Sequence, residues 1–130
     1  MGAHYLMDSN TLIDYLGGLL PPNGKQLVAG VIDRRELVIS VITHIELLGF
    51  QAAVGYLQKC HQLIDTAEVI PLVDSATIER AILVRRETKL KLPDAIIAAT
   101  ALVRDLTVIS RNEKDFGRVV GLKYVNPHAL

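Results

Sequence analysis

Four acidic residues, Asp8, Glu46, Asp94 and Asp115, stand where the local sequence pattern changes from one expected element to the next. Carboxylates gathered in one place repel one another unless a cation or protons compensate them. An all-oxygen ligand set suits Mg²⁺ or Mn²⁺ rather than zinc, and the histidines and the single cysteine show no zinc-binding spacing. A Mg²⁺ ion held by carboxylates generates a hydroxide nucleophile, so the expected chemistry is phosphodiester hydrolysis.

The elements that must position these acids follow from short apolar runs alternating with helical periodicity. The runs predict strands at 5–7, 37–41, 67–70, 106–110 and 123–125. Such alternation predicts an α/β fold, a three-layer α/β/α sandwich with a central parallel sheet of about four to five strands. The chain has the usual length of one domain and no linker or repeat, so 1–130 is expected to be a single domain.

This fold places the acids at a common edge. Asp8 ends the first strand, Glu46 lies on the helix after the second, and Asp115 follows the fourth. Ligands of open parallel sheets bind outside the carboxyl ends of the strands. Asp94, in the first turn of the uncharged helix 92–101, reaches that edge if its helix runs antiparallel to the strands.

Two of the acids also have ordinary structural explanations. Asp94 suits the start of a helix, because the helix dipole favours a negative charge there and Pro93 needs no N–H partner. Glu46 fits a capping box with Thr43 as N-cap. His44, close by, is interpreted as a cap-region or core histidine. Both explanations are compatible with a metal site.

Basic residues flank the proposed edge in sequence and are candidate contacts for substrate phosphates: Arg85, Arg86, Lys89 and Arg111. The alternative for those near the end of the preceding helix is a solvated helix terminus whose charge complements the dipole. Acidic and basic residues number fourteen each, so net charge argues neither for nor against nucleic acid.

Several classes of protein are not expected. The lone Cys60 provides no disulfide framework. The first residues lack a leader or lipid-attachment pattern, and no run approaches the roughly eighteen apolar residues of a membrane span. A cytoplasmic protein without membrane contact is therefore expected.

Four motifs in this order resemble PIN domains, most closely the VapC-type toxins of toxin–antitoxin pairs. The resemblance spans Tyr5 to Val125, and its motifs are Asp8-x-Asn10, Glu46, Leu92-Pro93-Asp94-Ala95-x-Ile97-Ala98-Ala99 and Ser110-Arg111-Asn112-x-x-Asp115-Phe116. Each motif alone is weak, whereas the four together are specific.

The resemblance implies a Mg²⁺- or Mn²⁺-dependent ribonuclease that a cognate antitoxin inhibits and that forms a homodimer. Asp8, Glu46 and Asp94 match the three acidic metal ligands of the family, and Asp115 matches a fourth, more variable one. The supporting polar residues that match are Asn10, Ser110 and Asn112. Ser110 stands where Thr is common in the family, and its hydroxyl can serve the same way.

Three other functions compete with this one. A catalytically silent PIN-like binding module would keep the fold and the antitoxin partner without nuclease activity. A haloacid-dehalogenase-like phosphatase also uses an Asp after the first strand, but it requires Asp-x-Asp where this chain has Asn10. A receiver-like switch needs an acceptor Asp after the third strand, which here ends at Pro71.

Overall fold

The computed structural model describes residues 4–130. The expectation that the chain begins without a leader or lipid signal falls partly on residues 1–3, which lie outside the described residues. The strands are β1 (Tyr5–Met7), β2 (Val38–Ser40), β3 (Glu68–Ile70), β4 (Thr107–Ile109) and β5 (Tyr124–Val125). The helices are α1 (Ser9–Leu16), α2 (Pro22–Asp33), α3 (Val41–Leu48), α4 (Val54–Thr66), α5 (Ser75–Thr88), α6 (Leu92–Arg104) and α7 (Glu113–Phe116).

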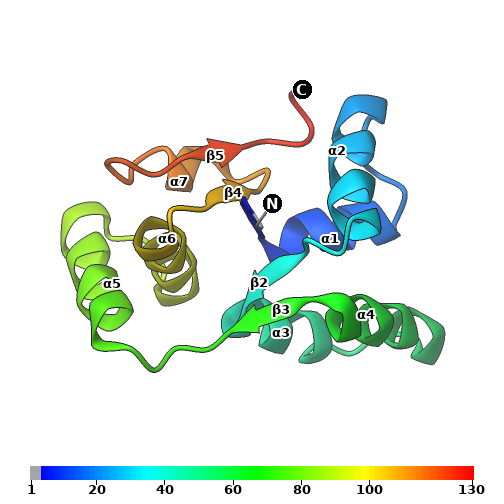
Figure 1. Cartoon of the computed structure of the whole chain (residues 1–130), viewed down its shortest axis with the longest axis horizontal. Coiled ribbons are helices and arrows are strands. Elements are labelled where there is room, and N and C mark those ends of the chain that lie inside the picture. Colours follow the sequence, from blue (N-terminus) through cyan, green and yellow to red (C-terminus); the bar gives the residue numbers. More distant parts are fainter. Residues whose placement is uncertain (1–3) are drawn as a thin grey trace.

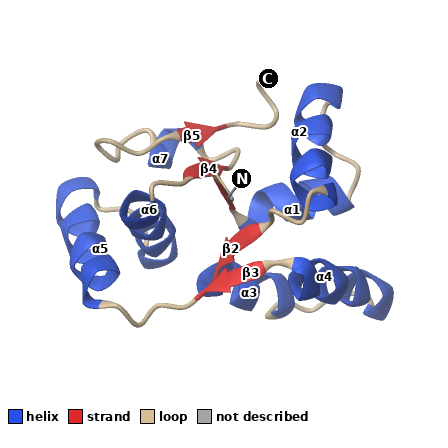
Figure 2. Ribbon diagram, in the orientation of Figure 1, coloured by secondary structure: helices blue, strands red, loops and turns tan. Residues whose placement is uncertain are grey.

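All strand pairs in residues 4–130 are parallel. β1, β4 and β5 form one ladder in the order β1-β4-β5, β2 pairs with β3, and β1 lies beside β2. The strands form a central layer, with α5 and α6 on one side and α1, α2 and α4 on the other (Figures 1 and 2). The predicted α/β architecture with a parallel sheet is therefore confirmed.

Successive residues of each central strand enter different halves of the core. Leu6 and Val108 pack in the cluster with α5 and α6, whereas Met7 and Ile109 pack in the cluster with α1 and α2. Side chains alternate between the two faces of a strand, so a strand covered on both faces is apolar at every position. This burial explains why the predicted strands are short continuous apolar runs.

The helix α6 is buried along most of its length. Its residues from Ala95 to Ala101 are all buried, and small side chains at Ala95, Ala98 and Ala99 let it pack closely. Pro93 lies in the first turn, and the helix ends before Asp105, which adopts the left-handed conformation at φ 54°. The predicted helix is confirmed, with Asp94 in its first turn.

The predicted capping box of Thr43 and Glu46 is wrong. Ser40, extended at the end of β2, is the N-cap of α3, and its hydroxyl accepts a hydrogen bond from the Ile42 N–H at 3.1 Å. Thr43 is buried inside the first turn, and Glu46 is left free to contact another element. At α5 the N-cap is Asp74, whose carboxylate accepts from the Thr77 N–H at 3.0 Å.

The C-terminal residues pack against the start of α2, where the chain end lies in Figure 1. The Asn23 Nδ2 donates to the Leu130 carbonyl at 3.3 Å, and Pro127 is buried. The absence of a side chain at Gly24 permits this approach, since a Cβ there would lie 1.8 Å from the Pro127 carbonyl oxygen. No helix within residues 4–130 has the length and hydropathy needed to cross a bilayer.

Replacing Gly24 by Ala is therefore expected to lower the free energy of unfolding by about 1–3 kcal/mol, because the backbone around Pro127 must move. Urea unfolding measures the change. Gly55→Ala is the matched control: its Cβ meets nothing within 4 Å, and a helical Gly-to-Ala change there is expected to be neutral or stabilising by up to about 1 kcal/mol. Equal stabilities of the two variants would contradict the packing described.

Candidate active site

Asp8 is the most constrained of the predicted site residues. It follows β1 directly, caps α1 and is 4% exposed. Its Oδ1 accepts from the Ser9 N–H at 2.9 Å, and its Oδ2 accepts from the Ser110 hydroxyl at 2.8 Å and from Asn10 Nδ2 at 3.1 Å. Because β1 and β4 are paired in parallel, their carboxyl ends bring Asp8 and Ser110 together.

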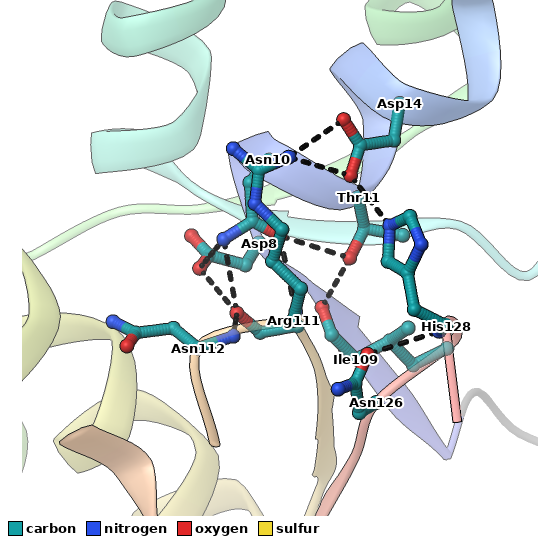
Figure 3. A network of polar contacts seen from close by, with 10 residues as sticks. Asp8, Asn10, Thr11, Asp14, Ile109, Arg111, Asn112, Asn126 and His128 are labelled. Atoms are coloured by element: carbon teal, nitrogen blue, oxygen red, sulfur yellow. Dashed lines mark hydrogen bonds and ion pairs between the residues drawn. The ribbon is translucent and has the colours of Figure 1, made fainter. Parts of the chain in front are cut away.

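Ser110 joins the predicted supporting residues into one network. Figure 3 labels Asp8, Asn10 and Asn112, which belong to it. Its Oγ accepts from Asn10 Nδ2 at 3.1 Å and from the Asn112 N–H at 3.0 Å. Asn112 Nδ2 in turn donates to Asp115 Oδ2 at 3.1 Å, which links the loop after β4 to α7. The structure thus gathers Asn10, Ser110 and Asn112 between two of the four acids.

The remaining acids interact with Asp8 through space or through a neighbour. Ser9 donates its hydroxyl to Glu46 Oε1 at 3.0 Å. Burial raises the pKa of Asp8, and the charge of Glu46 raises it further, while hydrogen bonds from Ser110 and Ser9 lower it. Burial also raises the pKa of Asp94, and the charges of Asp8 and Asp115 add to this effect.

This donor set fits a hard divalent cation. The side chains are all oxygen donors, they repel one another, and Asp94 has no hydrogen-bond partner for its carboxylate within residues 4–130. In that same part of the chain no three acidic, His or Cys side chains lie close enough to enclose an ion as they stand. A cation would therefore have to draw the carboxylates together while relieving their repulsion.

A second network, around Asp14, was missed by the sequence analysis. Arg111 Nη1 donates to both carboxylate oxygens of Asp14 at 2.9 Å, and His128 Nε2 lies 2.8 Å from Asp14 Oδ2. Figure 3 shows Arg111 reaching Asp14 from the loop after β4 and His128 approaching from the C-terminal segment. The signal available in the sequence is an acidic residue among apolar neighbours on a helix that follows a buried strand.

The basic residues named from the sequence separate in space. The charge of Arg111 lowers the pKa of Asp8, so this guanidinium belongs to the acidic edge. Arg85 instead donates to the Leu90 carbonyl at 2.8 Å, and Lys89 is the left-handed C-cap of α5. Arg85 and Arg86 line an apolar groove between α5 and α6. Their role as phosphate contacts stays a prediction.

In open parallel α/β folds the ligand site generally lies at the carboxyl ends of the strands, and the polar edge described above lies there. The PIN domain family matches residues 5–122. A chain of a toxin–antitoxin complex from Klebsiella pneumoniae is 31% identical, with 97% of this chain and 99% of that chain covered and a TM-score of 0.75. The chain therefore belongs to the PIN domain family. None of the curated proteins matches this sequence.

Other solved structures share the fold at lower identity. A chain of DNA-bound VapBC from Salmonella typhimurium is 22% identical, with a TM-score of 0.79 over 96% of this chain and 98% of that chain. A chain of FitAcB from Neisseria gonorrhoeae is 20% identical, with a TM-score of 0.76 over 97% of this chain and 99% of that chain. These two similarities establish the fold alone.

Asp94→Asn is expected to leave the fold intact and to keep or raise the free energy of unfolding of the metal-free protein at neutral pH. The raised pKa means that the ionised carboxylate is disfavoured in the folded state, despite the helix dipole. Between the unfolded and folded pKa values the folded state holds the extra proton, so stability falls as pH rises through that interval. Asp94→Asn should flatten this fall, measured by thermal unfolding across pH.

The matched control is Asp105→Asn at the other end of α6. Asp105 is exposed and pairs with Lys123 at 2.9 Å. Loss of such a surface pair costs at most about 1 kcal/mol, and Asn tolerates the left-handed conformation. Unfolding of Asp94→Asn alone would instead assign Asp94 a helix-starting role.

Proposed function

We propose that this protein is a metal-dependent endoribonuclease, the toxin of a type II toxin–antitoxin system. The observation that carries the proposal is the hydrogen-bond network at the carboxyl end of β1, where Ser9 contacts both Asp8 and Glu46 and Ser110 joins Asp8 to Asn112 and so to Asp115. The charges of Asp8 and Asp115 also raise the pKa of Asp94, beyond the larger effect of its burial. Membership of the PIN domain family and 31% identity to a chain of a toxin–antitoxin complex support it.

Asp8, Glu46 and Asp94 are the proposed ligands of Mg²⁺ or Mn²⁺, with Asp115 as a fourth. When bound by these residues, such an ion would supply Lewis-acid chemistry, the activation of a water molecule and the stabilisation of charge on the phosphate. The protein orients the ligands: Ser110 and Asn10 hold one oxygen of Asp8, Ser9 holds Glu46, and the packing of α6 fixes the position of Asp94.

The partners in this proposal are RNA, a cognate antitoxin and a second copy of the chain. The toxin–antitoxin complex from Klebsiella pneumoniae contains a chain that this one resembles along nearly its whole length. An open apolar groove, lined by Ile78, Ile82 and Leu92 and flanked by Arg85 and Arg86, adjoins the start of α6. Exposed apolar surface of this kind supports a protein partner. An RNA substrate places the protein in the cytoplasm.

Purified protein with Mg²⁺ or Mn²⁺ is expected to cleave RNA, and chelation of the metal is expected to stop cleavage. Asp8→Asn and Asp94→Asn should each lower the rate at least about a hundredfold, because losing residues that merely support metal ligands already costs about 10- to 100-fold. Cleavage is followed on labelled cellular RNA, with Asp105→Asn as the variant that retains activity.

Measurements of Mn²⁺ binding, together with RNA cleavage, distinguish the proposed nuclease from a silent binding module. Titration calorimetry should show Mn²⁺ binding to the parent protein and its loss in Asp94→Asn. If the parent binds no Mn²⁺ and Asp94→Asn changes nothing, the nuclease proposal fails. Metal binding without cleavage of any RNA would favour the silent module.

A further inference from the structure

The ion pair between Arg111 and Asp14 uses a single nitrogen of the guanidinium, Nη1. Nη1 lies 2.9 Å from both oxygens of Asp14. Nε and Nη2 make no hydrogen bond to any other residue between 4 and 130, and 55% of the Arg111 side-chain surface is exposed. The guanidinium is therefore held in place while its Nε–Nη2 edge stays open to an external acceptor.

Asp14 is buried, and its carboxylate contacts both Arg111 and His128. Its side chain is 2% exposed, and His128 binds the oxygen Oδ2 that Arg111 also contacts. Asp14 lies on α1, the helix that Asp8 caps, and Arg111 lies between Ser110 and Asn112 in the loop after β4. The ion pair of Asp14 and Arg111, here called the clamp, thus connects the same two segments that supply Asp8 and its partners.

We propose that Asp14 is a positioning residue that holds Arg111 so that the free Nε–Nη2 edge receives a backbone phosphate of RNA beside the acidic cluster. The inference rests on the proposed function, because it needs RNA as the ligand. The Nε–Nη2 edge offers two parallel N–H donors that match two phosphate oxygens. A guanidinium ordered in advance avoids the entropic cost of ordering it on binding.

The direction in which RNA affinity changes when Asp14 is replaced separates this positioning role from a general effect of charge. Removing an acidic residue makes the protein more positive and should strengthen binding to a polyanion. Removing Asp14 should instead weaken binding, because Arg111 becomes mobile. Asp105, an exposed acid that pairs with Lys123 far from the site, is the matched control for the charge change.

The test measures affinity for fluorescein-labelled, mixed-sequence single-stranded RNA by anisotropy. Every protein carries Asp94→Asn in the full chain, so that the RNA stays intact. Arg111→Gln should weaken binding about tenfold and reduce the salt dependence by about one phosphate contact. Asp14→Asn should weaken binding about two- to tenfold, the cost of ordering one arginine side chain. Asp105→Asn should leave binding unchanged or strengthen it.

The double variant Asp14→Asn with Arg111→Gln should bind no more weakly than Arg111→Gln alone, because Asp14 acts through Arg111. The inference is overturned if Asp14→Asn binds RNA more tightly than the protein carrying only Asp94→Asn. It is also overturned if Asp14→Asn weakens RNA binding as much in the presence of Arg111→Gln as it does alone. If Asp14→Asn does not fold, Arg111→Lys is the deciding variant, because lysine keeps the positive charge but lacks the two parallel N–H donors. An RNA affinity like that of Arg111→Gln supports the inference. An RNA affinity like that of the protein carrying only Asp94→Asn overturns it.

The two proposals fail in different ways. If the protein carrying only Asp94→Asn binds no RNA even at low salt, the RNA substrate of the proposed function is wrong and the role of Asp14 falls with it. If that protein binds RNA and Arg111→Gln changes nothing, the clamp inference alone is overturned.

Discussion

The structure depends on a carboxyl group, that of Asp8, held out of water at the junction of two parallel strands. Asp8 is 4% exposed, and within residues 4–130 three hydrogen bonds, from Ser9, Asn10 and Ser110, offset the cost of burying it. These donors come from α1 and from the loop after β4, so the site exists only when β1 and β4 are paired. Assembly of the polar edge therefore requires that β1 and β4 be paired.

The acids around Asp8 work against folding in the absence of a cation. Burial and neighbouring charges raise the pKa of both Asp8 and Asp94, which means that their ionised forms are disfavoured. The buried body of α6 compensates, since its small apolar residues pack against the sheet and α5. A tightly packed helix can present an unfavourable carboxylate at its end, where a more mobile segment would turn it toward solvent.

The fold was predictable to the extent that it rests on local pattern. Apolar runs located every strand end to within one residue. The capping box at Thr43 and Glu46 failed because Ser40, a residue earlier interpreted only as part of a strand, has the extended backbone and hydroxyl that a cap requires. Two good caps three residues apart compete, and strand length decides between them.

The sequence by itself determined the α/β class, the family resemblance and which acids fall at the ends of their segments, because these properties depend on residue order alone. Only the tertiary structure decided that Ser9 contacts Glu46, that Ser110 bridges Asp8 and Asn112, and that Asp14 clamps Arg111 and His128. Apart from the bond between Ser110 and Asn112, which are two positions apart, these contacts join residues 37 to 114 positions apart in the chain. Such pairings depend on how the strands order themselves in the sheet, and no local pattern encodes that order.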